Sequence, residues 1–422
     1  MEVIIVGAGI GGLTLALSLV ERGITPTIYE TVREVKPLGV GINVLPHATA
    51  ILTDLGLQED LRATGIETKE LCYFNKFGQE IWREPRGLAA GYPVPQFSIH
   101  RGQFQHLLLK TANQRLPAEN IKFGLSYLNH EITSSGRVEC LFEERATGQV
   151  KGPVEADVLI AADGIHSAVR AKFYPNEGPP RWSGAVLWRA AVESAQFLSG
   201  RSMIMAGHAD QKIVIYPISK QAYDQGRSYT NWIAELTLGK PGDPAPTQEN
   251  WNKAGHKADF LPQFKDWIYD WLDYPKLAES TEQIFEFPMV DRDPVEAWSF
   301  GPTTLLVDAA HPMYPIGSNG ASQAIIDART LTNRLTEYGA DITGALKAYE
   351  SERLHATAAI VAANRRQGPD EIMQIVHERA PNGFEKLDDI ISREEREQIA
   401  AKYKVLAGFD HATVSKVAKA VN

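Results

Sequence analysis

Apolar side chains in the first thirty residues change their spacing twice. Residues 2–6 are a mainly β-branched run, which is typical of a strand buried on both faces. Apolar positions then recur three and four residues apart from Ile10 to Val20, and Gly23 suits the end of a helix. A further strand-like stretch follows at 25–29. The N-terminus is therefore predicted to be a strand–helix–strand unit.

Helical spacing returns in three later segments, at 48–65, 101–116 and 260–272. Between residues 70 and 99, short aromatic stretches such as LCYFNKFGQEIW predict strands joined by tight turns. The segment VEADVLIAADG, at 154–164, predicts another buried strand.

The middle and the end of the chain have different patterns. Residues 183–287 contain strand-like stretches such as GAVLWRAAV and KIVIYPI, which predict an antiparallel sheet. After TTLLVD the chain is mainly helical, with a break at Gly368 and the proline that follows it. Ser392 and Glu395 have the spacing of a capping box that opens a further helix. We therefore predict an α/β protein with two interleaved lobes followed by C-terminal helices.

Composition narrows the class of protein. A chain of 422 residues with 44% hydrophobic and 23% charged residues is typical of a globular protein with two lobes. A net charge of −9 argues against nucleic acid as a partner. Cys72 and Cys140 are too few for a cysteine-rich zinc site and give little reason to expect secretion, so we expect no metal. With no signal-like or membrane-spanning run, we expect a cytoplasmic protein.

The first chemical motif is a G-x-G-x-x-G run between the first strand and the first helix. In this pattern Gly7 permits a tight turn, Gly9 lets a pyrophosphate approach the backbone, and Gly12 lets helix and strand pack closely; Gly11 lies beside them. Glu30 ends the second strand, where a carboxylate accepts from ribose hydroxyls. The pattern predicts binding of a dinucleotide with an unphosphorylated ribose, such as FAD or NAD. The alternative is a turn with a structural role only.

The second motif is DVLIAADGIHSAVR, at 157–170. Its strand ends at Asp163 and Gly164, and Ser167 and Arg170 follow on what is predicted to be a new helix. Taken alone, such an Asp-Gly pair is more often a turn than a binding site.

The third motif follows the strand TTLLV. Asp308 stands where a carboxylate could bond a polyol, Pro315 stiffens the loop, and Gly317, Gly320 and Ala321 leave room for a flat ring.

A helix is predicted to begin at about Ser318, with its N-terminal N–H groups facing that ring. Such a helix end would stabilise the negative charge that a reduced flavin carries. The alternative is an ordinary Gly/Pro loop with Asn319 as the helix cap.

Together the three motifs resemble those of the single-component FAD-dependent aromatic hydroxylases, which have the para-hydroxybenzoate hydroxylase fold. The stretches LLVDAAHPMYPIGSNGASQAIIDA and FSIHRGQFQHLL are most similar to the phenazine and salicylate hydroxylase-like branches, and VDRDPVEAW also fits. The resemblance covers roughly residues 1–365. It implies a Rossmann-like FAD-binding domain interleaved with an antiparallel β-sheet substrate domain, plus C-terminal helices. The expected divisions are 1–72, 97–182 and 283–365 for FAD, 73–96 and 183–282 for substrate, and 366–422 for the C-terminal segment.

The resemblance also implies a role for each motif. The glycines of the first motif and Glu30 would hold the adenosine half of FAD, and Arg101 would contact the pyrophosphate and ribityl region. Asp163 would lie near the pyrophosphate and the path of NAD(P)H. Asp308 would hold the ribityl chain, and residues 315–321 would flank the isoalloxazine.

One position departs from the family pattern. The family usually has glycine before the late aspartate, whereas this chain has Val307. A valine fits the end of a buried strand, and we expect FAD still to bind, with altered affinity or ribityl placement.

The activity implied is hydroxylation of an aromatic ring with NAD(P)H and O₂ through a flavin C4a-hydroperoxide. Epoxidation or oxidative decarboxylation by a related flavoenzyme, an NAD-dependent dehydrogenase without flavin, and a flavin-binding protein without turnover are the alternatives. The W-x-W-x-I-P motif of flavin-dependent halogenases is absent. Both a monomer and a homodimer remain open.

The substrate pocket is expected between the flavin and the strand-rich lobe. Trp188 and Arg189 are the favoured pair, because a guanidinium could meet a carboxylate or phenolate; an ion pair at a sheet edge is the equal alternative. Tyr216 and Pro315 are further candidates, although a core position suits Tyr216 better. Three histidines are interpreted as structural. His311 is expected to make a hydrogen bond within its loop, His47 to serve its helix, and His208 to occupy an ordinary sheet position.

Overall fold

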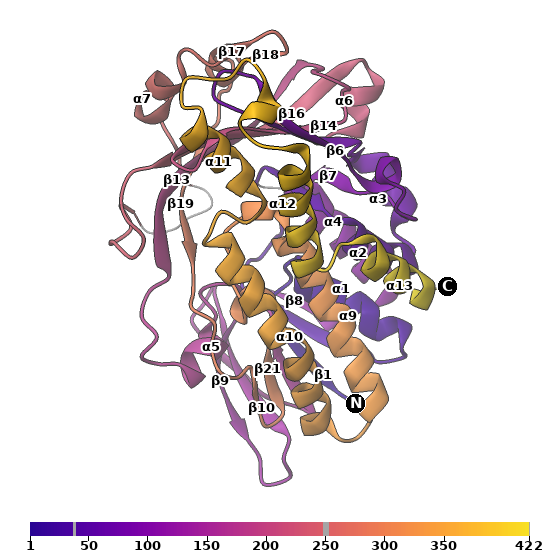
Figure 1. Ribbon diagram of the computed structural model, residues 1–422. Helices are drawn as coiled ribbons and strands as arrows, with labels where there is room; N and C mark the ends of the chain where they lie inside the picture. Colours follow the sequence, from indigo (N-terminus) through magenta and orange to yellow (C-terminus); the bar gives the residue numbers. More distant parts are fainter. Residues whose placement is uncertain (37–38, 248–252, 422) are drawn as a thin grey trace.

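The structure, a computed structural model, describes residues 1–36, 39–247 and 253–421. Residues 37, 38, 248–252 and 422 lie outside the described residues, although the ranges predicted for the two lobes and the C-terminal segment include them. Two large sheets dominate the fold, one in the lower half of Figure 1 and one in the upper half.

The lower sheet has six strands, and it contains the predicted N-terminal unit. Its spatial order is β20 (Ser299–Phe300), β21 (Thr303–Leu305), β12 (Val158–Ala161), β1 (Val3–Val6), β2 (Pro26–Glu30) and β8 (Ile121–Phe123). Neighbouring strands are parallel except β20 and β21. All four side chains of β1 are buried, as a strand covered on both faces requires.

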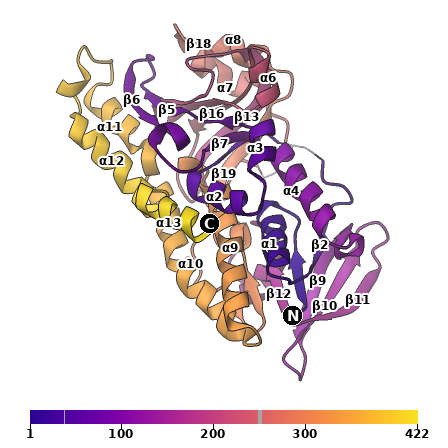
Figure 2. The ribbon, with the colours of Figure 1, turned by 90° about the vertical axis from the view of Figure 1, so that its right-hand side faces the viewer.

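Each face of this sheet has its own cover. Helices α1 (Ile10–Glu21), α9 (Gly320–Tyr338) and α10 (Ile342–Asn364) lie on one side, as Figure 2 shows. A three-stranded sheet of β9 (Leu125–Ile132), β10 (Val138–Glu144) and β11 (Val150–Ala156) lies on the other. Tyr29 of β2 stacks on Phe142 of β10, with ring centroids 3.7 Å apart.

The third strand of that smaller sheet, β11, runs from Val150 to Ala156, and the chain enters β12 only two residues later, at Val158. The segment predicted as one buried strand at 154–164 is therefore the end of one strand and the whole of the next, in two different sheets. Only the second of the two has every side chain buried.

The upper sheet has seven strands and contains the predicted strands of the middle block. Its spatial order is β19 (Phe285–Asp291), β13 (Arg181–Ala195), β16 (Arg227–Thr237), β15 (Gln211–Pro217), β14 (Ser202–His208), β5 (Glu70–Phe74) and β6 (Glu80–Pro85). Neighbours are antiparallel except β14 and β5, which run parallel. A separate three-stranded sheet consists of β3 (Gly41–Val44), β7 (Phe97–His100) and β4 (Ile66–Glu67).

The predicted helix at 48–65 is two helices, α2 (Pro46–Asp54) and α3 (Gln58–Thr64). Gly56 separates them with φ +75°, a left-handed conformation that ends a helix. The helix predicted at 101–116 is confirmed as α4 (Arg101–Arg115).

The prediction of a helix at 260–272 is wrong. A short helix, α7 (Lys257–Phe260), gives way to a 3-10 turn at Leu261–Phe264 and a two-stranded hairpin of β17 (Ile268–Tyr269) and β18 (Leu272–Asp273). Pro262 lies in the turn, and a proline cannot continue a helix interior. The aromatic side chains produced a helix-like spacing because several of them enter one core on the outer face of the upper sheet, the face away from the lower sheet.

The C-terminal segment forms α11 (Glu371–Arg379), α12 (Arg393–Leu406) and α13 (His411–Val421), and these helices lie along one side of the molecule in Figure 2. Ser392 caps α12 as predicted, because its Oγ accepts from the N–H of Glu395 at 3.1 Å. The Glu395 carboxylate instead pairs with Arg379, so only half of the capping box forms. The remaining helices are α5 (Ala168–Phe173), α6 (Lys220–Asp224) and α8 (Tyr274–Glu279).

A buried ion triad ties the upper sheet to the C-terminal segment. The Lys212 ammonium of β15 lies 2.8 Å from the Asp370 carboxylate and 3.3 Å from that of Glu235. All three side chains are almost completely inaccessible to solvent. Burial opposes the charge of Lys212, but the two carboxylates outweigh it and raise its pKa above the ordinary value.

Within the described residues, no helix is long and apolar enough to cross a membrane. The same part of the chain has no group of three or more His, Cys, Asp and Glu side chains arranged to hold a metal ion. Cys72 and Cys140 are buried free thiols, and burial raises the pKa of each to about 12.

The triad leads to a test of how the C-terminal segment is held. Changing Lys212→Ala leaves two buried carboxylates facing each other, so we expect the free energy of unfolding to fall by about 3–5 kcal/mol. Lys220→Ala removes an exposed ion pair with Asp224 and should cost less than about 1 kcal/mol. Denaturant unfolding measures both. Equal losses of unfolding free energy in the two variants would show that the buried triad stabilises the fold no more than an exposed ion pair does.

Candidate cofactor and substrate site

The glycines of the first motif lie in the loop after β1 and in the first turn of α1, and their surroundings differ. Gly7 has φ +105°, and a Cβ there would lie 2.3 Å from the carbonyl oxygen of Ala162. At Gly12 a Cβ would lie 2.1 Å from the carbonyl oxygen of Gly7. At Gly9 it would meet no atom within 4 Å. The protein's own packing thus requires two of the glycines, whereas the third borders open space, as close approach by a ligand would need.

Glu30 ends β2 directly beside this loop. Its carboxylate accepts from the N–H of Ala8 at 2.7 Å and from the N–H of Val32 at 2.9 Å. The side chain is half-buried, and each carboxylate oxygen can accept more than one hydrogen bond. Glu30 therefore fixes the loop while keeping capacity for ribose hydroxyls.

The second motif lies at the end of β12, next to β1. Asp163 accepts from the N–H of Ala168 at 2.9 Å through Oδ2, whereas its buried Oδ1 has no hydrogen-bond partner within the described part of the chain. Burial raises the pKa of this carboxyl, although hydrogen bonds from Ser167 and the backbone offset part of the shift. A Cβ at Gly164 would meet nothing within 4 Å, so this turn also borders open space.

Arg170 connects the second motif to the third. Ser167 caps α5 by accepting from the N–H of Arg170 at 2.9 Å. The Arg170 guanidinium, only 1% exposed, donates from Nη1 to the carbonyl oxygens of Ala309 and Ala310 at 2.9 and 2.8 Å. It also pairs with Glu177. Sequence reasoning placed Arg170 on the helix but missed this role, which depends on a partner 139 residues away.

The sequence suggested that Val307 ends the strand, but the structure places it beyond the strand. β21 stops at Leu305, and Val307 lies in a turn with φ +59°, a conformation that is strained for a β-branched residue. Its Cγ2 atom lies 2.3 Å from where a Cβ on Gly11 would be. Gly11 is therefore required by the bulk of Val307 and not by a ligand.

Asp308 follows Val307 in the turn after β21. Solvent reaches its side chain, yet enough protein surrounds it that burial raises its pKa, an effect that His311 and Arg101 partly offset. Arg101, at the start of α4, is half-buried, and burial lowers its pKa while Asp308 acts in the opposite direction. The structure thus brings these two predicted residues together, 207 positions apart in sequence.

A buried network beneath Asp308 was not predicted. His311 pairs with Asp327 of α9, and Arg353 of α10 donates from Nε to the other oxygen of Asp327 at 2.6 Å. Burial opposes ionisation of Asp327, but His311 and Arg353 outweigh it and lower its pKa. The prediction of a hydrogen bond within the loop is therefore wrong for His311 Nε2, which pairs with a helix instead. The one signal in the sequence was a carboxylate on the apolar face of α9.

The loop from Pro315 to Ala321 leads into α9, which begins at Gly320, two residues later than predicted. Asn319 precedes the helix, but its side chain does not cap it. No acidic residue stands in the first turn either, so among the described residues neither Asn319 nor a first-turn carboxylate caps the first N–H groups of α9. At Gly320 a Cβ would meet nothing within 4 Å, and Ala321 is half-buried. This helix start is suited to an electron-rich ligand.

Gly317 differs from the prediction that it leaves room for a ring. It has φ +75°, and a Cβ there would lie 2.0 Å from the hydroxyl oxygen of Tyr403 of α12. The C-terminal segment therefore fills this position. Pro315, two residues earlier, is exposed.

The two residues of the favoured pocket pair, Trp188 and Arg189, lie on opposite faces of the upper sheet. Side chains alternate along β13, so Trp188 enters the core on the outer face, where it stacks on Phe260 with centroids 5.3 Å apart. Arg189 points to the inner face, with its guanidinium 5.0 Å from the centre of the Phe287 ring. Burial lowers the pKa of Arg189, and the positive charge of Arg101 lowers it further.

Tyr216, His208 and His47, the other side chains considered from the sequence, lie at three separate places in the structure. Tyr216 is buried on the inner face, where its ring would lie 2.5 Å from a Cβ on Gly41, and burial raises its pKa. His208, half-buried, stacks on His377 of α11 with centroids 3.9 Å apart. His47 is fully enclosed, so burial lowers its pKa to about 3, and neither ring nitrogen has a partner among the described residues. The helix role expected for His47 therefore has no hydrogen bond to support it.

These residues together outline one elongated site. The turns after β1, β12 and β21 meet at the carboxyl edge of the lower sheet, which is where ligands bind in open α/β sheets. Three features suit a dinucleotide that carries a flat ring: the open space at Gly9, the unpartnered Asp163 oxygen and the uncapped start of α9.

Comparison with known proteins agrees with this geometry. Residues 1–364 match the family model described as "FAD binding domain". The chain is 45% identical over 366 residues to the phenazine 1,6-dicarboxylic acid hydroxylase PhzS of Lysobacter antibioticus, which covers 86% of this chain and 89% of the relative. It is 29% identical over 378 residues to 3-hydroxybenzoate 6-hydroxylase of Klebsiella oxytoca, covering 87% of this chain and 88% of the relative.

Solved structures show the same fold. Klebsiella pneumoniae HpxO complexed with FAD and uric acid aligns with a TM-score of 0.72 at 23% identity, covering 100% of this chain and 96% of that one. CtdE in complex with FAD and its substrate aligns with a TM-score of 0.74 at 20% identity, covering 96% and 98%. FAD is therefore the dinucleotide that the site is built to hold.

The position of Asp308 predicts a role in cofactor binding. Removing a carboxylate that would accept from the cofactor's hydroxyls in Asp308→Ala should weaken FAD binding roughly tenfold or more. The flavin absorbance per protein after purification, and titration of the apoprotein with FAD, measure this. Asp389→Ala, which removes an exposed carboxylate, is the matched control. Unchanged FAD affinity in Asp308→Ala would contradict the role.

Val307 gives a second prediction. Glycine adopts φ +59° without strain, so Val307→Gly should relieve about 1–3 kcal/mol of backbone strain and lose about 1 kcal/mol to the greater entropy of the unfolded chain. We expect the apoprotein to unfold at the same or a higher denaturant concentration. A clear loss of stability would mean that packing of the valine against α1 outweighs its strain.

Proposed function

Since this chain belongs to the FAD binding domain family and is, like its curated relatives, a monooxygenase, we propose that it uses NAD(P)H and O₂ to hydroxylate an aromatic or heteroaromatic small molecule. The observation that carries the proposal is the convergence of three turns on the carboxyl edge of the lower sheet, with open space beside Gly9, Gly164 and Gly320. A separate domain for the nicotinamide is not needed, because the co-substrate would bind transiently at the same site.

Each turn would hold one part of FAD. The backbone from Gly7 to Gly12 and the Glu30 carboxylate would bind the adenosine half, beside the open space at Gly9. The free oxygen of Asp163 supports a place near the pyrophosphate. Asp308 and Arg101, which face each other, would contact the ribityl and pyrophosphate groups. Arg170 acts indirectly, since it fixes the carbonyl groups that follow Asp308.

When bound and reduced by NAD(P)H, FAD supplies the activation of dioxygen and the transfer of one oxygen atom. The chain's own residues bind, orient and shield. The uncapped N–H groups at the start of α9 would stabilise negative charge on the reduced ring, since a helix N-terminus favours anions. Pro315 and the turn after it would limit where that ring lies, and the upper sheet would exclude water from the reacting face.

The substrate side is proposed to favour an anionic ring. Arg189 is buried on the inner face of the sheet beside Phe287, and both burial and Arg101 disfavour its charge. A carboxylate or phenolate on the substrate would compensate for that cost. One relative, PhzS, is named for hydroxylation of phenazine 1,6-dicarboxylic acid, a flat heteroaromatic acid. We propose heteroaromatic acids of this kind as the substrate class.

The test is oxidation of NADH and NADPH by the FAD-loaded protein with aromatic acids, phenols and phenazines, followed by product mass. Stimulated oxidation with a gain of one oxygen atom is expected. Loss of carbon dioxide together with that gain would indicate oxidative decarboxylation instead. If no ring stimulates oxidation, hydroxylation is not the activity.

The same assay examines Arg189. Arg189→Met should raise KM for anionic rings roughly tenfold or more and leave neutral rings nearly unaffected, because only the charged ligand loses a partner. Arg227→Met removes an exposed cation of the same sheet, paired with Glu193, and serves as the control. Equal effects on neutral and anionic rings would mean that Arg189 has a structural role only.

A further inference from the structure

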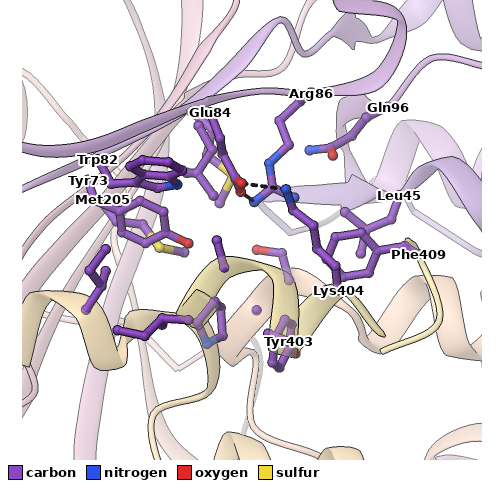
Figure 3. Close-up of a pocket in the computed structure, with 18 residues that line it drawn as sticks. Leu45, Tyr73, Trp82, Glu84, Arg86, Gln96, Met205, Tyr403, Lys404 and Phe409 are labelled. Carbon is purple, nitrogen blue, oxygen red and sulfur yellow. Dashed lines mark ion pairs between the residues drawn. The ribbon is translucent and has the colours of Figure 1, made fainter. Parts of the chain in front are cut away.

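A cavity lies between the upper sheet and the C-terminal segment, as Figure 3 shows. One wall is the sheet, which contributes Tyr73, Trp82 and Met205. The opposite wall is α12, with Tyr403 and Lys404. The family model ends at residue 364, so this second wall comes from a part of the chain that the model does not cover.

The cavity adjoins the proposed flavin site. Gly317 and Ser318, from the loop that leads into α9, line it directly. Its sheet residues continue the row that contains Arg189: Tyr73 pairs with Met205, and Met205 with Val214, across β5, β14 and β15. Val214 pairs in turn with Ile233, and Ile233 with Arg189. A molecule held here would therefore lie on the same face of the sheet and beside the same loop.

The two ends of this cavity differ in polarity. Aromatic and sulfur-containing side chains make up most of the sheet wall, whereas Glu84, Arg86, Gln96 and Lys404 gather at one end. The volume open to water-sized molecules is about 30 Å³, so a ring would enter by displacing side chains. Unbranched methionines such as Met205 adapt readily to such a change.

The polar end carries one more positive than negative charge. Glu84 pairs with Arg86 through one carboxylate oxygen and with Lys404 at 2.6 Å through the other. Among the described residues that line the cavity, Glu84 is the one carboxylate facing these two cations. Burial opposes its charge, but Arg86 and Lys404 outweigh burial and lower its pKa. Asp370 is already paired with Lys212 at 2.8 Å.

Several buried polar atoms that line the cavity have no hydrogen-bond partner within the described chain. Among them are Nε of Arg86, a residue 7% exposed, and Oε1 of Gln96, a residue 2% exposed. The Arg86 guanidinium also lies 5.7 Å from the centre of the Phe409 ring, which stabilises its charge without using that N–H. A buried donor and acceptor left unpaired are costly, so the site favours a ligand that supplies both an acceptor and a donor.

We infer that this cavity holds a flat aromatic substrate by its carboxyl group, with Arg86 and Lys404 as the cationic partners and the ring between the sheet and the Gly317 loop. The carboxylate would accept from Nε of Arg86 and from the Lys404 ammonium, and a hydroxyl on the same ring could donate to Gln96. The C-terminal segment then determines which substrates bind. This inference rests on the proposed function, and it places the carboxyl group at Arg86 and Lys404 in place of Arg189. The Arg189→Met assay and the Lys404→Met titration below distinguish the two positions.

The test compares a charged ligand with its neutral analogue. Phenazine-1-carboxylate and phenazine-1-carboxamide are titrated calorimetrically into the oxidised, FAD-loaded full-length protein without NAD(P)H. We expect the wild type to prefer the carboxylate by about tenfold or more. Lys404→Met should reduce this preference to about threefold or less, mainly by weakening the carboxylate. Lys402→Met, an exposed cation two residues earlier on α12, should change nothing.

Glu84→Gln provides a second variant with the opposite expectation. Removing the competing carboxylate should strengthen binding of phenazine-1-carboxylate about threefold or more and leave the carboxamide unchanged. A merely structural role for the cluster predicts equal losses for both ligands. FAD content and the unfolding transition of each variant show that it is folded and loaded.

The outcomes separate this inference from the proposed function. If the wild type adds oxygen to an aromatic ring but the carboxylate preference is unaltered in Lys404→Met and Glu84→Gln, this inference is overturned and the function stands. If the wild type binds neither phenazine and no ring stimulates NAD(P)H oxidation, both are overturned.

Discussion

The close approach of α1 to the carboxyl ends of β1, β12 and β21 determines the rest of the site. Three positions without side chains allow it: Gly7 lies against the Ala162 carbonyl, Gly12 against the Gly7 carbonyl, and Gly11 against Val307. A methyl group at any of them would overlap a neighbour. Because these positions let the helix pack directly against the strands, its N-terminus and the turns of the neighbouring strands lie together at one edge of the sheet.

A second level of order comes from buried charge. Arg170 holds the turn after β21 by two carbonyl groups, and Asp327 joins that turn to α9 and α10 through His311 and Arg353. Both groups are satisfied by partners distant in sequence, so either would be costly to break. The position of Asp308 is thus set by residues that need not touch a ligand.

Much of the cofactor side could be predicted from sequence, because each motif combines a strand end, a turn and a helix start within about fifteen residues. The substrate side could not. Period-two alternation does indicate that Trp188 and Arg189 face opposite ways, and treating them as a pair ignored it. Whether Gly317 borders a ligand or Tyr403 depends on a helix 86 residues away, which no local pattern places. The aromatic spacing near Pro262 imitated a helix because its side chains share a core.

Tyr403 also has a consequence for how the protein is made. The chain emerges from the ribosome from its N-terminus, and the turns, glycines and acids that surround the proposed flavin all precede residue 330. Helix α12, which packs Tyr403 against Gly317, is synthesised after all of them. The cofactor cradle can therefore assemble on the growing chain while the side toward α12 is still open, and the C-terminal segment closes it afterwards.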